Sequence, residues 1–262
     1  YPVGGDCHVT DGKGGRGMSW IANVVSSARG MFEKGMEGVP VNAEVEGNKI
    51  HGILYQGTGV DAIIYLHGAF EFGEGSSDCK AYVKAGYSVL MLKYDIEGTK
   101  ECKLEADVME ARNAAVWMRG RFKSLRHIYA IGVSRGGYVL LWLALSWPGW
   151  FRKFVCMAGP VDIGGMFDGS DVRLRTRMPA AHVANIRHYF DIGGSPLDCS
   201  KPLWKKPLLY LSGSKDVVVP PGHGELLHSK VPLVTYQATP YGHGLANEKE
   251  VQDFTIRWLS VT

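Results

Sequence analysis

The chain has 262 residues, a net charge of +3, 45% hydrophobic residues and 21% charged residues. This length and composition predict one large globular domain and exclude a disordered or fibrous protein. The basic residues are scattered apart from Arg173, Arg175 and Arg177, so the small positive charge does not indicate a nucleic-acid-binding protein. No apolar run approaches the roughly 18 residues that span a bilayer, so we expect a soluble protein without a membrane span.

Two features bear on the cellular compartment without deciding it. The five cysteines show no CxxC pair and no metal-ligand spacing, and their odd number leaves at least one thiol unpaired within a monomer. The chain begins at Tyr1 rather than at a methionine, which leaves open the removal of a leader. We therefore expect no metal site, and the disulfides, the oligomeric state and the choice between cytoplasm and secretion stay open.

The first part of the chain differs from the rest. We interpret residues 1–40 as an N-terminal extension packed on a domain of residues 41–262. Strand-like runs begin at Val39, and Gly47–Asn48 between the first two suits a hairpin turn. Six further short apolar runs predict strands at 61–68, 87–95, 126–133, 153–159, 207–213 and 232–240.

Helical segments separate these strands. Helical spacing or apolar length predicts helices at 102–122, 135–147, 223–230 and 247–260. Strands alternating with helices favour an α/β fold, in which a mostly parallel central sheet carries helices on both faces. Residues 161–200 fit neither a crossover helix nor a tight loop, so we expect a short lid-like insertion there.

One strand-to-helix junction carries a chemical motif. Residues 132–136 read Gly-Val-Ser-Arg-Gly and match G-x-S-x-G, in which a strained turn projects the serine hydroxyl above the edge of a sheet. The motif alone is common by chance, but here a strand-like run precedes it and a helical run follows it. Ser134 is therefore a candidate nucleophile, and we expect its flanking glycines to relieve crowding by neighbouring backbone.

A serine nucleophile needs a base and a carboxylate that orients the base. In this architecture both follow the serine in the order acid, then histidine, on loops after strands. Asp216 and His243 come directly after two successive predicted strands and meet that order. Asp162 is a competing acid, while His223 and His228 are expected to be surface or capping residues.

The oxyanion that forms during acyl transfer needs preorganised donors. The turn itself supplies the backbone N–H of Arg135. The loop at His67–Gly68, after an earlier strand, is expected to supply a second donor, the N–H of Ala69. His67 is then a structural residue beneath the loop and not a base.

Taken together, "YLHGAF", "GVSRGGY", "GGSPLD", "SGSKDVVVP" and "YGHG" make the chain resemble an α/β-hydrolase fold serine hydrolase. It is similar in particular to the catalytic domain of prolyl oligopeptidases and to small acyl and feruloyl esterases, over roughly residues 41–262. The resemblance implies Ser134 as nucleophile, His243 as general base and acid, and Asp216 as the orienting carboxylate. It also implies Ala69 and Arg135 as oxyanion donors, and an acyl-enzyme mechanism without metal or organic cofactor.

The resemblance does not decide the substrate. Prolyl oligopeptidases carry a large β-propeller, which residues 1–40 are too short to form, and this favours hydrolysis of a small carboxylic ester. A peptidase or amidase, an acyltransferase, and a non-catalytic binding protein of the same fold are the alternatives. Phe70, Phe72, Arg187 and Tyr189 are the candidate substrate contacts, the arginine as a partner for a substrate carboxylate.

Overall fold

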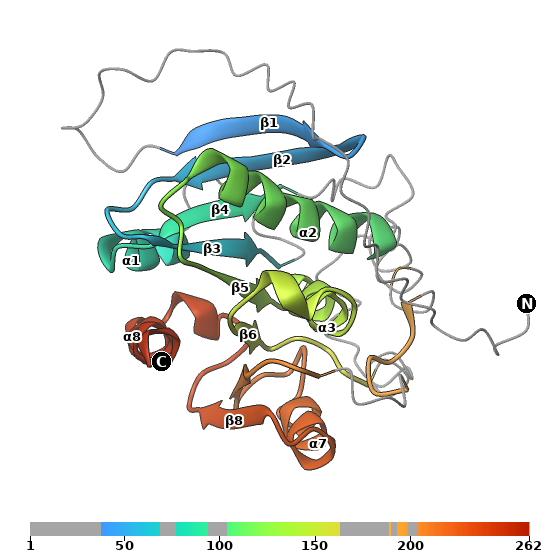
Figure 1. The fold of residues 1–262 in the computed structure, drawn as a ribbon. Helices are drawn as coiled ribbons and strands as arrows, with labels where there is room; N and C mark the ends of the chain where they lie inside the picture. Colours follow the sequence, from blue (N-terminus) through green and yellow to red (C-terminus); the bar gives the residue numbers. More distant parts are fainter. Residues whose placement is uncertain are drawn as a thin grey trace, which may run out of the picture.

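The computed structural model describes residues 38–68, 77–93, 104–162, 189, 193–198 and 204–261. Within them lies one eight-stranded sheet with the strand order β1-β2-β4-β3-β5-β6-β7-β8 (Figure 1). The strands are β1 Val39–Val45, β2 Asn48–Tyr55, β3 Asp61–Leu66, β4 Ser88–Leu92, β5 His127–Val133, β6 Phe154–Met157, β7 Leu208–Gly213 and β8 Val234–Thr239.

The sheet is antiparallel at one edge and parallel elsewhere. β2 pairs with β1 and with β4 in antiparallel fashion, and the pairs from β4 through β3, β5, β6 and β7 to β8 are parallel. The β1–β2 hairpin turns through Glu46 and Gly47, at φ values of 53° and 76°. The turn thus lies one residue before the predicted Gly47–Asn48 pair, because a two-residue hairpin loop of this hand needs positive φ at both central residues.

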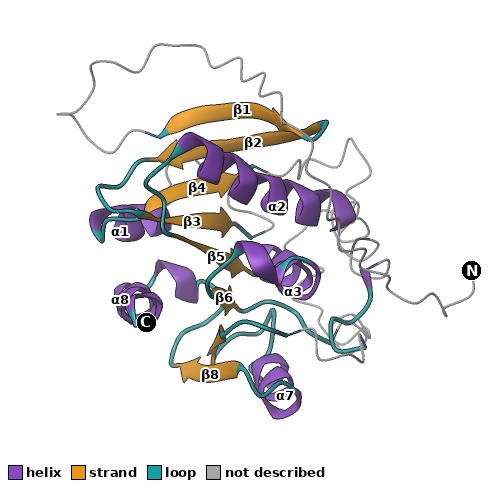
Figure 2. Ribbon diagram, in the orientation of Figure 1, coloured by secondary structure: helices purple, strands orange, loops and turns teal. Residues whose placement is uncertain are grey.

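Helices cover both faces of the sheet (Figure 2). Residues of α2 Leu104–Arg121, α3 Arg135–Ser146 and α7 Gly222–Lys230 belong to one hydrophobic cluster. Residues of α1 Ser77–Lys84 and α8 Lys249–Ser260 belong to a second cluster. The clusters lie on opposite faces because successive side chains of a strand point to opposite sides, as Ile63 and Ile64 of β3 do. This arrangement confirms the predicted α/β class.

Helix α1 was not predicted, because it is short and contributes only isolated apolar positions. Cys79 and Tyr82 lie three residues apart and are both buried against the sheet. Two short 3-10 helices, Pro148–Trp150 and Leu245–Asn247, complete the described elements. Among the described residues, no helix combines the length and apolarity that crossing a membrane would need.

The predicted insertion and extension are described only in part. Val161 and Ser195, near the two ends of the predicted insertion 161–200, are joined because the Ser195 hydroxyl donates to the Val161 carbonyl at 2.8 Å. Of the predicted N-terminal extension only residues 38–40 are described, and β1 begins inside them, at Val39. The division into an extension and a domain stays a prediction.

Candidate active site

The turn between β5 and α3 holds Ser134 in an unusual backbone conformation. Its φ is 53° and its ψ is −118°, a combination that non-glycine residues seldom adopt and that costs about 1–3 kcal/mol. Two backbone hydrogen bonds fix the turn: the Ser134 N–H donates to the Met157 carbonyl at 2.8 Å, and the Tyr138 N–H donates to the Ser134 carbonyl at 3.1 Å. The strain is therefore maintained by β6 on one side and by α3 on the other.

The glycines on either side of Ser134 are required by close backbone approach. A Cβ on Gly132 would lie 2.3 Å from the Gly136 carbonyl oxygen, and a Cβ on Gly136 would lie 2.0 Å from the Leu66 carbonyl oxygen. No side chain fits at such distances. The end of β3 is thus packed directly against the first turn of α3, beside the serine.

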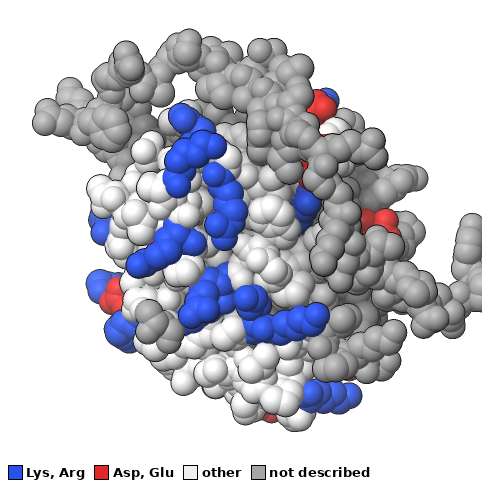
Figure 3. Space-filling model, in the orientation of Figure 1, with Lys and Arg blue, Asp and Glu red and all other residues white. Residues whose placement is uncertain are grey.

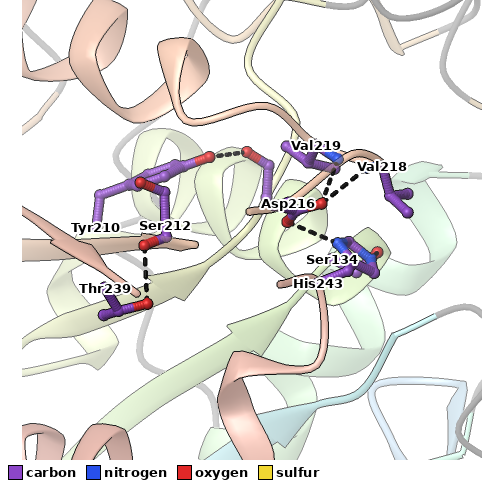
Figure 4. A network of polar contacts seen from close by, with 9 residues as sticks. Ser134, Tyr210, Ser212, Asp216, Val218, Val219, Thr239 and His243 are labelled. Atoms are coloured by element: carbon purple, nitrogen blue, oxygen red, sulfur yellow. Dashed lines mark hydrogen bonds and ion pairs between the residues drawn. The ribbon is translucent and has the colours of Figure 1, made fainter. Parts of the chain in front are cut away.

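His243 connects Ser134 to Asp216 (Figure 4). The His243 Nε2 lies 2.9 Å from the Ser134 Oγ, and the His243 Nδ1 lies 2.9 Å from the Asp216 Oδ2. With Nδ1 protonated, the ring donates to the carboxylate and Nε2 accepts the serine proton. The Asp216 carboxylate is fully buried, whereas 29% of the His243 side chain is exposed. The serine end of this chain of hydrogen bonds is therefore the end nearer to solvent.

The loop after β7 holds the carboxylate in place. The Asp216 Oδ1 accepts the N–H groups of Val218 at 2.8 Å and Val219 at 2.9 Å, which leaves Oδ2 for His243 (Figure 4). The neighbouring loop after β8 approaches closely, because a Cβ on Gly213 would lie 2.4 Å from the Tyr241 carbonyl oxygen. The acid and the histidine thus come from two loops that are packed against each other.

The loop after β3 begins beside the serine. The buried His67 ring donates from Nδ1 to the Gly68 carbonyl at 2.6 Å, and burial lowers the pKa of this histidine. A Cβ on Gly68 would lie 3.4 Å from the Ser134 Cβ. Ala69, Phe70 and Phe72 lie outside the described residues, so the expected second oxyanion donor and the two expected aromatic contacts stay predictions.

Of the remaining sequence-based candidates, Tyr189 and Asp162 lie within the described residues. Tyr189 is 2% exposed and its hydroxyl donates to the Asp107 Oδ2 at 2.6 Å, which argues against the expected substrate contact. Arg187 lies outside the described residues. Asp162, the competing acid, is exposed, and the His243 Nδ1 is bonded to Asp216 instead.

The expectation that His223 is a surface or capping residue is wrong. His223 is 8% exposed, and its Nδ1 accepts the backbone N–H groups of Val161 and Asp162, both at 3.1 Å. Position along the chain suggested a free helix terminus, but the loop after β6 folds over this end of α7. His228 is exposed, as expected, and its Nδ1 donates to the Val234 carbonyl at 2.7 Å.

Sequence reasoning missed Asp107, which binds the side chain of Arg135. The Arg135 guanidinium donates to the Asp107 Oδ2 at 2.6 Å, and both side chains are nearly buried. The sequence nevertheless indicates that Asp107 is buried, because it lies at helical spacing from Leu104 and Ala111, on the apolar face of the predicted helix. A lone carboxylate on such a face indicates a buried partner.

The described part of the chain holds no cluster of three or more His, Cys, Asp or Glu side chains suited to a metal ion. What the described residues do assemble is a serine hydroxyl, an imidazole and a buried carboxylate in hydrogen-bonded series. An imidazole that accepts a serine proton and is fixed by a carboxylate increases the nucleophilicity of that serine.

Comparison with known structures places this site in a known fold. The acylaminoacyl peptidase of Pyrococcus horikoshii is similar with a TM-score of 0.68 and 14% identity, over 87% of this chain and 42% of the peptidase. An esterase of Pyrococcus furiosus is similar with a TM-score of 0.66 and 19% identity, over 86% of this chain and 90% of the esterase. A Pyrobaculum calidifontis esterase is similar with a TM-score of 0.62 and 19% identity, each chain covered to 86%. The predicted α/β-hydrolase fold is thereby confirmed.

Sequence comparison defines the family. No curated protein sequence matches the chain significantly. The prolyl oligopeptidase family matches residues 95–250, which is more than half of the chain and includes Ser134, Asp216 and His243. The chain therefore belongs to the prolyl oligopeptidase family of serine hydrolases, as its motifs predicted.

Proposed function

We propose that the protein hydrolyses small carboxylic esters through an acyl-enzyme formed on Ser134. The observation that carries this proposal is the unbroken series Ser134, His243 and Asp216, with both linking distances at 2.9 Å. The strained backbone at Ser134 supports it further, since such strain concentrates at functional sites. In this proposal Ser134 is the nucleophile, His243 the general base and acid, and Asp216 the residue that orients the imidazole.

The first half of the reaction transfers the acyl group to the enzyme. The Ser134 Oγ attacks the ester carbonyl carbon while its proton passes to the His243 Nε2. The carbonyl oxygen becomes an oxyanion, which we expect the backbone N–H of Arg135 to stabilise together with that of Ala69. The carbon–oxygen bond to the leaving group then breaks, and the alcohol departs with the proton that His243 held.

The second half restores the enzyme with water. His243, again neutral, takes a proton from a water molecule that attacks the acyl carbon, and the same oxyanion donors act again. The bond from Ser134 to the acyl group breaks, the serine recovers its proton from His243, and a carboxylic acid is released. Throughout, Asp216 keeps the proton of His243 on Nδ1, because the Val218 and Val219 amides hold its carboxylate.

Two classes of substrate compete in this proposal. The likeness to esterases from Pyrococcus furiosus and Pyrobaculum calidifontis, over 90% and 86% of their lengths, supports an ester. Membership of the prolyl oligopeptidase family and the likeness to an acylaminoacyl peptidase favour a peptide or acylated amino acid as the second candidate. This chain spans 42% of that peptidase, and we place the ester first on the likeness to the two esterases.

A fluorophosphonate probe tests the nucleophile. We expect the purified protein to gain one probe mass at Ser134, and the Ser134→Ala variant to gain none and to lose about 10⁴-fold or more in ester hydrolysis. Ser146→Ala is the matched control, because Ser146 is an exposed serine at the other end of α3 and should leave labelling intact. Probe incorporation that persists in Ser134→Ala contradicts the assignment.

Panels of substrates then distinguish ester hydrolysis from hydrolysis of peptides or acylated amino acids. p-Nitrophenyl esters of increasing chain length report the size of the acyl site, and aminoacyl and acylaminoacyl naphthylamides report peptidase activity. Higher kcat/KM on the naphthylamides than on every ester would replace the first candidate with the second. Products that carry an added alcohol in place of water would indicate acyl transfer.

A further inference from the structure

Beside the nucleophile, the side chain of Arg135 is buried and held on two sides. Only 6% of the side chain is exposed, and the guanidinium donates to the Asp107 Oδ2 at 2.6 Å. The guanidinium carbon also lies 4.5 Å from the centre of the Tyr189 ring, a cation–π arrangement. A lysine lacks the planar guanidinium group that can bind a carboxylate and lie over an aromatic ring at the same time, so the site suits arginine specifically.

Asp107 joins three elements through one oxygen atom. Its Oδ2 accepts from the Arg135 guanidinium and from the Tyr189 hydroxyl, each at 2.6 Å. Asp107 belongs to α2, Arg135 is the first residue of α3, and Tyr189 lies between β6 and β7 in the predicted lid-like insertion. Burial raises the pKa of Asp107, while the Arg135 charge and both hydrogen bonds oppose that shift.

The first turn of α3 contacts the same insertion a second time. The Tyr138 hydroxyl donates to the Gly194 carbonyl at 2.6 Å, and the rings of Tyr138 and Tyr189 meet edge to face with centres 6.2 Å apart. A Cβ on Gly193 would lie 2.1 Å from the Tyr138 hydroxyl oxygen. Residues three apart share one side of a helix, so Arg135 and Tyr138 form one docking surface.

We propose that Asp107, Arg135 and Tyr189 are positioning residues that hold the Arg135 backbone N–H in place for the oxyanion. This inference rests on the proposed function, in which that N–H is an oxyanion donor. Arg135 follows Ser134 directly, so a guanidinium fixed by Asp107 and Tyr189 restricts the peptide that carries the donor. The same contacts make the position of the donor depend on the position of Tyr189. None of the three side chains is required to touch the substrate.

The contacts of the Arg135 side chain fix its position. A buried ion pair often adds little stability compared with apolar side chains of the same volume, but its short charged hydrogen bonds define one geometry. Oxyanion donors act only when they are aimed at the transition state, and small displacements lower the rate. Such a network therefore acts on kcat more than on substrate binding.

Two conservative variants test the network. Asp107→Asn keeps the shape but removes the charge, and Tyr189→Phe removes one hydroxyl and keeps the ring against Arg135. We expect both to lower kcat on p-nitrophenyl acetate, by about tenfold for Asp107→Asn and about threefold for Tyr189→Phe, with KM changed less than twofold. The rate of fluorophosphonate labelling at Ser134 should fall in the same ratio, and all assays are run well below the melting temperatures.

Two matched controls lie outside the network. Glu46→Gln breaks the ion pair between Glu46 and Arg112, which is also on α2 but pairs with the β1–β2 turn. Tyr129→Phe removes a hydroxyl from a buried ring of β5, five residues before Ser134. Both controls should leave kcat and the labelling rate within twofold of the unmodified protein.

A double variant shows whether the residues act together. Because the Tyr189 hydroxyl acts through Asp107, Asp107→Asn with Tyr189→Phe should be no slower than Asp107→Asn alone. Unchanged kcat and labelling in folded Tyr189→Phe, or a change confined to KM or to the melting temperature, would overturn the inference. Tyr189→Phe remains decisive if Asp107→Asn does not fold. Failure of the unmodified protein to react at Ser134 would instead refute the proposed function.

Discussion

At the residue scale, the geometry around Ser134 depends on the absence of side chains next to it. Gly136 lies in the first turn of α3, where helix propensity alone predicts that alanine stabilises by about 1 kcal/mol. A Cβ at this position would nevertheless lie 2.0 Å from the Leu66 carbonyl oxygen. The overlap involves backbone on both sides, so no rotamer change relieves it.

We therefore expect Gly136→Ala to destabilise the protein, against the propensity rule. The free energy of unfolding should fall by about 3 kcal/mol, at the upper end of the usual cost of overpacking, as measured by urea denaturation. Gly149→Ala is the control, because no atom lies within 4 Å of an added Cβ there, and its effect should stay within about 0.5 kcal/mol. A stabilised Gly136→Ala variant would contradict the close approach of β3 and α3.

At the element scale, a histidine links helix α7 to the loop after β6. His223 accepts two backbone N–H groups on Nδ1, a role that a ring protonated on both nitrogens cannot fill. Burial lowers the pKa of His223, although the Asp162 and Asp216 charges oppose that shift. The link between these elements is therefore formed by the neutral ring.

The sign of the pH effect follows from proton binding. When the folded pKa is below the unfolded value of about 6.5, the unfolded chain binds the proton first as the pH falls. The contribution of His223 to stability is thus complete above about pH 6.5 and decreases as the pH falls toward the folded pKa. His67, whose pKa burial also lowers, acts in the same direction.

We expect His223→Gln to weaken the pH dependence of stability. The glutamine side chain has an oxygen acceptor for the loop amides but does not titrate, so the loss of unfolding free energy between pH 7 and pH 5 should be smaller than in the unmodified protein. Urea denaturation across that range measures it, with His51→Gln, at an exposed position, as the control. If the unfolding free energy of His223→Gln changes with pH as it does in the unmodified protein, the His223 ring does not contribute to the pH dependence of stability.

At the scale of the whole molecule, one sheet separates two hydrophobic clusters. Ile63 and Ile64 are neighbours in β3, both fully buried, and they belong to opposite clusters. Because the backbone hydrogen bonds of the sheet connect the two faces, we expect both clusters to unfold in one cooperative transition.

Substitutions on either face of the sheet should therefore destabilise the protein in the same cooperative unfolding transition. Ile63→Ala and Ile64→Ala are each expected to lower the unfolding free energy by about 2–5 kcal/mol, with coincident fluorescence and circular dichroism curves. Val60→Ala, in the turn before β3 and 42% exposed, should change it by less than about 1 kcal/mol. Separate transitions in either isoleucine variant would show that the two faces are independent units.

Tertiary folding also arranges the surface charge. Along the chain the basic residues are scattered apart from Arg173, Arg175 and Arg177, yet on the face over α2 and α3 Lys and Arg side chains gather with few acidic neighbours (Figure 3). Other basic side chains are used within the fold: the Arg112 guanidinium of α2 lies 5.1 Å from the Trp147 ring centre and 5.4 Å from that of Trp150. Composition gives the net charge of the protein, whereas the packing of the helices and strands decides which charged side chains lie close together on the surface.

The sequence alone determined the fold class and the grouping of Ser134, Asp216 and His243. Apolar runs and turn residues are local signals, and parallel strands deliver the loops after β5, β7 and β8 to one edge of the sheet. Only the tertiary structure decided the contacts of Asp107, Tyr189 and His223. Their partners lie 28, 82 and 62 residues away along the chain, and periodicity describes neighbours within a helix or strand but not which distant surfaces pack together.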